Sequence, residues 1–114
     1  MVLEQGNKVH IMVRRQFEKD LRRHFVGEVL EVTGLLARVE GYAFVLETPS
    51  NQYVRRPDKR VRIIGLADSG NIIIVLPPEA NLEQVKYVRS KDNHLTVTDG
   101  KSFALDINEF GANQ

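Results

Sequence analysis

A hydrophobic period of two, which begins after Gly27, constrains the fold of this chain more than any other feature. In LLARVE (residues 35–40), the first, third and fifth residues fall on one face of an extended chain and the other three fall on the opposite face. Similar short runs follow, as far as SFALDI (residues 102–107), and turn-forming residues separate them. The chain therefore predicts about eight short β-strands and an all-β fold.

Turn signals divide these runs. Gly41 interrupts an otherwise continuous run and predicts a sharp bend or a bulge. NIIIVLP (residues 71–77) is apolar throughout, so we expect a strand that is buried on both faces. Residues 78–114 are expected to form a C-terminal β-meander, with turns at residues 91–93 and at Asp99-Gly100.

A short N-terminal helix is predicted over residues 14–25. Phe17, Leu21 and Phe25 recur there at four-residue spacing with charged residues between them, and Gly27 follows as a stop signal. The expected fold is therefore a small bent β-barrel preceded by this helix. We expect a single domain over residues 1–114, with a core in residues 15–77 and the meander in residues 78–114.

Several kinds of chemistry find no support in the sequence. The chain has no Cys, which excludes disulfides, thiolate nucleophiles and Cys-based zinc sites. His10, His24 and His94 are scattered, so no metal ligand set and no cofactor is expected. The C-terminal carboxylates Asp99, Asp106 and Glu109 have no nucleophile or base beside them, and we expect a protein that is not an enzyme.

Charge is distributed unevenly, although the formal net charge is only +1. Residues 1–65 carry twelve Lys and Arg against eight Asp and Glu, so an anion-binding surface is expected in this half. No apolar run approaches the roughly 20 residues of a membrane-spanning helix. We expect a cytoplasmic protein without a membrane partner.

The segment QYVRRPDKRVRII (residues 52–64) is the candidate binding site. If Arg56 to Lys59 form a hairpin turn, Arg55 lies opposite Arg60, and Tyr53 lies opposite Arg62. These four residues would then share one outward face. Arg binds phosphate and Tyr offers a ring for base stacking, and Arg22 and Arg23 could extend the surface. The alternative is a solvated hairpin whose charges keep a sheet edge from aggregating.

The order of these segments weakly resembles the Sm-like (Hfq-type) group of small β-barrels over residues 15–77. The resemblance rests on FVGEVLEV (residues 25–32), GYAFVL (residues 41–46), the basic hairpin and NIIIVLP. It implies a strongly bent β-barrel that forms rings through its strand edges and binds RNA. No loop that reads bases is recognisable, and no base-reading residue is assigned. An oligonucleotide-binding barrel or another SH3-like barrel fits the same order of segments nearly as well.

Two functions follow as hypotheses. The first is a small β-barrel that binds single-stranded RNA through Tyr53, Arg55, Arg60 and Arg62, with Arg22 and Arg23. The second is a homo-oligomeric assembly or protein-interaction module, in which exposed edges such as residues 71–77 pair with another copy.

Overall fold

The computed structural model describes residues 2–15, 17, 19–67 and 69–107. Over these residues the chain forms nine β-strands and one turn of 3-10 helix, so the all-β class is confirmed. The chain divides into an N-terminal unit, residues 1–78, and a C-terminal unit, residues 79–114.

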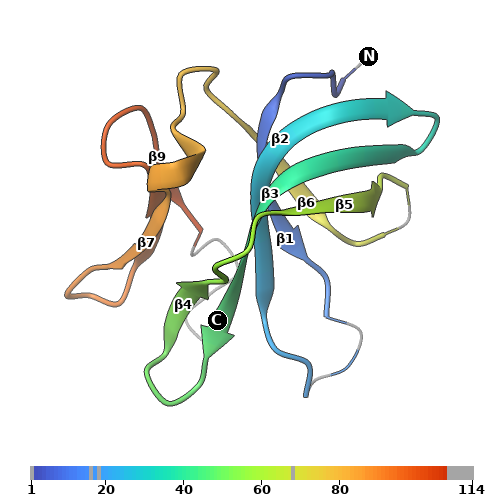
Figure 1. The fold of residues 1–114 in the computed structure, drawn as a ribbon. Helices are drawn as coiled ribbons and strands as arrows, with labels where there is room; N and C mark the ends of the chain where they lie inside the picture. The colour runs from blue at the N-terminus through green and yellow to red at the C-terminus, as the bar shows by residue number, and fades with distance from the viewer. Residues whose placement is uncertain (1, 16, 18, 68, 108–114) are drawn as a thin grey trace. The chain divides into compact units, whose positions relative to one another are not determined.

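Six strands, each antiparallel to its neighbours, build the N-terminal unit (Figure 1). They are β1 (Lys8–Val13), β2 (Arg23–Thr33), β3 (Leu36–Glu47), β4 (Gln52–Arg55), β5 (Arg60–Gly65) and β6 (Ile72–Leu76). The order across the sheet is β4-β3-β2-β1-β6, and β5 pairs with the same strand, β3, as β4 does.

Two glycines allow β2 and β3 to approach closely in the middle of this sheet. Gly27 and Gly41 lie directly opposite each other. A Cβ on Gly41 would collide with the carbonyl oxygen of Val26, and one on Gly27 would lie 2.5 Å from that of Glu40. Any larger residue would force the strands apart, and both strands follow a wide curve here (Figure 1).

The core of the N-terminal unit lies on one face of the curved sheet. Ile11 of β1, Phe25 of β2 and Ala43 of β3 lie side by side across the register, so their side chains point the same way. Burying a side chain such as Phe25 stabilises the fold by about 1.5–3 kcal/mol. The whole cluster comprises Val9, Ile11, Phe25, Val29, Ala37, Val39, Ala43 and Ile64.

The described strands form antiparallel sheets, but they do not close into a barrel. The expectation of a β-barrel is therefore confirmed only for its antiparallel strands. Within the described residues, no backbone pairing joins β5 to β6. The expectation that residues 71–77 are buried on both faces is wrong. Ile72 and Val75 are 37% and 51% exposed, because β6 is an edge strand, and among the described residues it pairs only with β1.

The predicted helix over residues 14–25 is also wrong. Residues from Arg23 onward belong to β2. Before them the chain makes a turn, in which the Phe17 amide donates to the Asp20 carboxylate (3.1 Å) and the Asp20 amide donates to the Phe17 carbonyl (3.0 Å).

Burial of Phe25 explains why the strand wins over the helix. A helix of about twelve residues is marginal in water unless packing supports it. Phe25 is 2% exposed within the core, whereas Phe17 and Leu21 remain exposed. The four-residue spacing of these three side chains therefore marked no common buried face.

The C-terminal unit is the predicted three-strand antiparallel meander. A short 3-10 helix, η1 (Leu82–Gln84), precedes β7 (Lys86–Arg89), β8 (Leu95–Thr98) and β9 (Ala104–Asp106). The Asp99 carboxylate accepts backbone N–H groups from Asn81, Lys101, Ser102 and Phe103. These bonds join the segment before η1 to the β8–β9 turn and hold the pKa of Asp99 below its usual range, that from Asn81 most strongly.

Candidate functional site

The segment around Pro57 is not a hairpin. β4 and β5 do not pair with each other, because both pair with β3 along the same side. Arg55 lies opposite Phe44, and Arg60 lies opposite Gly41. The predicted pairing of Arg55 with Arg60 and of Tyr53 with Arg62 is therefore wrong.

The position of both strands on the same side of β3 explains the difference in side-chain direction, and a two-residue insertion separates the two strands. From Arg55 to Arg60 the chain advances five residues, while β3 advances three between their partners, Gly41 and Phe44. Because faces alternate along β3, Arg55 and Arg60 fall on opposite faces of the sheet. Tyr53 lies on the face of Arg55, and Arg62 lies on the face of Arg60.

Tyr53 and Arg55 lie among aromatic rings on one face of the sheet, which we call the arginine–aromatic cluster. The Tyr53 ring stacks on His24, with centroids 4.5 Å apart and planes 23° apart. The His24 ring meets His10 edge to face at 4.9 Å. The Arg55 guanidinium lies 4.7 Å from the centre of the Tyr42 ring, within cation–π range. The cluster comprises His10, His24, Tyr42, Tyr53 and Arg55.

The two histidines of the cluster are buried, with His10 fully buried and His24 8% exposed. Burial lowers the pKa of His10 to about 4. Burial, with the nearby charges of His10 and Arg22, lowers the pKa of His24 to about 3. Both imidazoles are therefore neutral at physiological pH, and the positive charge of the cluster comes from arginine.

Arg22 and Arg23 separate from each other. The Leu46 amide donates to the Arg22 carbonyl (3.0 Å), so Arg22 lies beside Leu46, the residue that pairs with Tyr53. The charge of Arg22 also contributes to the lowered pKa of His24. Arg23 lies opposite Val45, which has Val54 on its other side. It therefore belongs to the sheet face away from the cluster.

Arg60 and Arg62 also lie on that other face. The Arg62 guanidinium is 5.7 Å from the centre of the Phe25 ring, at the border of the core. Arg60 makes a loose ion pair with Asp58, at 3.9 Å between exposed groups. Of the six predicted binding residues, the structure thus brings together Tyr53, Arg55 and Arg22 and separates Arg23, Arg60 and Arg62.

Sequence reasoning missed His10, His24 and Tyr42 as neighbours of Tyr53. These residues come from three different strands, so only the register brings them together. For Tyr42 the sequence held one usable signal. It is two residues from Phe44, so the two aromatic side chains were expected to share one face of a strand.

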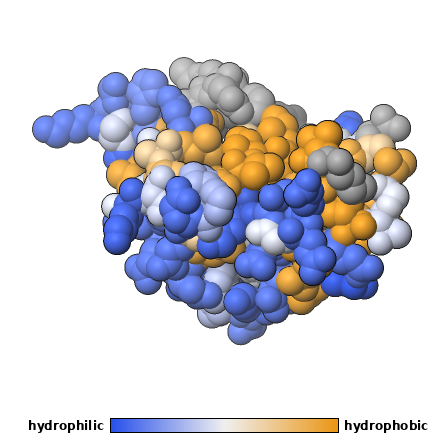
Figure 2. Space-filling model, turned by 90° about the horizontal axis from the view of Figure 1, so that it is seen from above, coloured by the Kyte–Doolittle hydropathy of each residue, from blue (hydrophilic) through white to orange (hydrophobic). Residues whose placement is uncertain are grey.

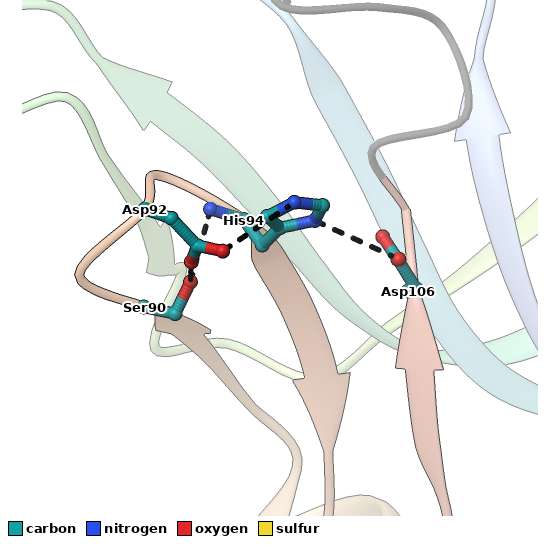
Figure 3. Close-up of polar contacts among 4 residues, drawn as sticks. All are labelled: Ser90, Asp92, His94 and Asp106. Atoms are coloured by element: carbon teal, nitrogen blue, oxygen red, sulfur yellow. Dashed lines mark hydrogen bonds and ion pairs between the residues drawn. The ribbon is translucent and has the colours of Figure 1, made fainter.

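The polar side chains of the C-terminal unit form no catalytic arrangement in the described residues. His94 lies 3.7 Å from Asp92 and 3.8 Å from Asp106 (Figure 3). The Ser90 hydroxyl donates to Asp92, not to the imidazole that a nucleophilic serine needs. Asp99 is occupied by backbone amides, and the predicted carboxylate Glu109 lies outside the described residues.

An apolar hollow of about 380 Å³ lies beside β6. Its lining carries no charge and consists of Val2, Leu3, Val32, Leu66, Ile73 and Val75. The N terminus lies at the top of Figure 1, and Figure 2, which views the molecule from above, shows hydrophobic surface next to hydrophilic surface. Sequence reasoning missed this hollow, because its lining comes from four separate segments of the chain.

Comparisons with protein-family models, with curated proteins and with solved structures found no match to this chain. Across the part of the chain that the structure describes, no helix is long and apolar enough to cross a membrane. The same residues hold no group of three His, Asp or Glu side chains arranged around a metal ion. The resemblance to the Sm-like group stays a prediction.

Proposed function

We propose that the N-terminal unit binds single-stranded RNA and acts without catalysis. The observation that carries this proposal is the arginine–aromatic cluster, where Tyr53 and Arg55 share one face of β4. Aromatic rings stack on bases of any sequence, and the planar guanidinium of Arg pairs with phosphate oxygens. One face of a short strand thus offers both kinds of contact that a single strand needs.

The basic edge gives a path for the phosphate backbone away from the cluster. We use this name for residues 55–62 (RRPDKRVR), which carry five Lys and Arg against one Asp and are exposed throughout. A flexible single strand that stacks at Tyr53 can follow this edge and meet Arg56, Lys59 and Arg60. The sequence preference of such binding is weak, because phosphate contacts carry no base information.

Assembly of several copies is the second candidate, and the exposed apolar edge of β6 favours it. The two candidates are compatible, because β6 and β4 lie at opposite ends of the strand order. The cytoplasmic location and the homo-oligomer stay predictions.

Fluorescence anisotropy with labelled single-stranded RNA and DNA, at two salt concentrations, tests the proposal. We expect affinity to fall steeply with salt, and each phosphate contact that is removed should reduce the logarithmic salt slope by about 0.7. Arg55→Ala should weaken binding more than Arg60→Ala, because only Arg55 lies in the cluster, and the double variant should weaken it most.

The matched control is Lys86→Ala/Lys101→Ala, which removes two exposed charges from the C-terminal unit. It should bind almost as tightly as the wild type. Two results would overturn the proposal: no binding by micromolar protein at low salt, or equal losses in the control and in the Arg55→Ala/Arg60→Ala variant.

A further inference from the structure

Within the described part of the N-terminal sheet, the outer edge of β6 is an unpaired strand edge. β6 pairs with β1 on one side, and no described residue pairs with it on the other. Its five residues, IIIVL, carry no charge and no Pro. An exposed edge of this kind presents unpaired N–H and C=O groups together with apolar side chains, and proteins normally block such edges.

The opposite edge of the same sheet is blocked in two ways. The insertion between Arg55 and Arg60 divides it into β4 and β5, so it offers no continuous strand. Its cations would also have to lie beside the apolar side chains of β6 if the two edges met, at a desolvation cost. The best partner for β6 among the edges of this sheet is therefore β6 itself.

Self-pairing matches the apolar residues one for one. In an antiparallel pair centred on Ile74, Ile74 faces Ile74 of the partner subunit, and Ile73 faces Val75 of the partner subunit. A two-fold axis through Ile74 relates the two strands, as in a closed dimer.

The apolar hollow adds to this surface. Ile73 and Val75 belong both to β6 and to its lining. A second copy paired at β6 continues the sheet and brings its own Ile73 and Val75 to the same face, where they cover the hollow. A strand pair of five residues is short, and the hollow supplies further apolar area that a stable dimer needs.

We propose that this chain forms a two-fold symmetric homodimer through antiparallel pairing of β6 with β6 of a second copy, which covers the apolar hollow. Neither the edge of β6 nor the lining of the hollow carries a charge, so the partner strand should be apolar as well. The β6 edge of a second copy meets this requirement and is always present at the same concentration. The dimer does not depend on RNA binding, since no residue of the arginine–aromatic cluster lies in β6.

Sedimentation equilibrium of the full chain tests the dimer. We expect the wild type to have twice the 13.0 kDa mass of one chain. Val75→Lys should be a monomer, because it places a charge at the pairing edge on a side chain that is 51% exposed in the single chain. Ile63→Lys is the matched control, since Ile63 is 57% exposed on β5 at the other edge, and it should remain a dimer.

Amide hydrogen exchange gives a second readout that needs no variant. In the dimer, the outward amides of residues 72–76 should exchange more slowly as the protein concentration rises, while those of residues 60–65 should not change. A monomeric wild type, a mass above that of a dimer, a dimeric Val75→Lys variant or a monomeric Ile63→Lys variant would overturn the proposal. Exchange at residues 72–76 that does not depend on concentration would do the same.

Discussion

The two edges of the N-terminal sheet, β6 on one side and β4 with β5 on the other, differ in how well they are protected against pairing with another strand. Each edge strand has backbone N–H and C=O groups that no further strand of the sheet pairs. Along β4 and β5 an insertion and five cations discourage pairing, whereas β6 carries five uncharged apolar residues and no interruption. The comparison teaches that the unprotected edge is where a partner strand is expected, and that the protected edge is available to a soluble anionic ligand.

The largest effect is expected at Gly41, because β3 pairs with β5 up to this residue and with β4 from Phe44 onward. Gly41→Ala should cost more than about 3 kcal/mol of unfolding free energy, since its Cβ would collide with the carbonyl oxygen of Val26. Urea denaturation measures the loss.

Gly65→Ala is the matched control for Gly41→Ala. A Cβ on Gly65 would meet nothing closer than the Cβ of Ser69 at 4.0 Å. We expect a change within about 1 kcal/mol, the usual difference between Gly and Ala in a strand. Equal losses for the two variants would show that β2 and β3 have room at their closest approach.

The buried histidine pair contacts both edges of the sheet, and acid should lower the free energy of unfolding by protonating it. His10 lies opposite Ile74 of β6, and His24 stacks on Tyr53 of β4. The unfolded chain binds protons at these histidines near pH 6.5, while the pKa of His10 in the folded state is about 4 and that of His24 is about 3. The free energy of unfolding should therefore fall as the pH drops below about 6.5, and His10 alone should account for about 2 kcal/mol at pH 5.

Urea denaturation at pH 7.5 and at pH 5 measures this effect, before most carboxylates titrate. His24→Phe keeps a ring against Tyr53 but cannot bind a proton. The difference in stability between the two pH values should therefore shrink in this variant. An unchanged difference would mean that His24 takes no part in the acid sensitivity.

The smallest effect is expected for the ion pair that joins β2 to β3. Arg38 Nη1 lies 2.6 Å from Glu31 Oε1, and both side chains are about half exposed. A double-mutant cycle with Arg38→Ala and Glu31→Ala should give a coupling energy of about 0.2–1 kcal/mol that weakens in salt. A coupling energy well above that range would mean that this exposed ion pair contributes substantially to the stability of the sheet.

The sequence predicted the strands well wherever a local signal was enough. Alternation marked residues 35–40, and the turn residues marked the meander of the C-terminal unit. It failed over residues 14–25, where a four-residue spacing outweighed the alternation of Arg23, Phe25 and Gly27 on the core face. The local pattern was ambiguous there, and only the pairing of Phe25 with Ile11 and Ala43 decides between helix and strand.

The candidate site shows the same limit. By itself the sequence determined the all-β class, the absence of thiol chemistry and the basic character of residues 55–62, because these depend on composition and on neighbours along the chain. Only the tertiary structure decided that Tyr53 and Arg55 lie beside His24 and Tyr42, and that Arg60 and Arg62 lie on the opposite face. The physical reason is that strand register is set by backbone pairing between distant residues, and the strand with which a segment pairs decides which side chains share a face.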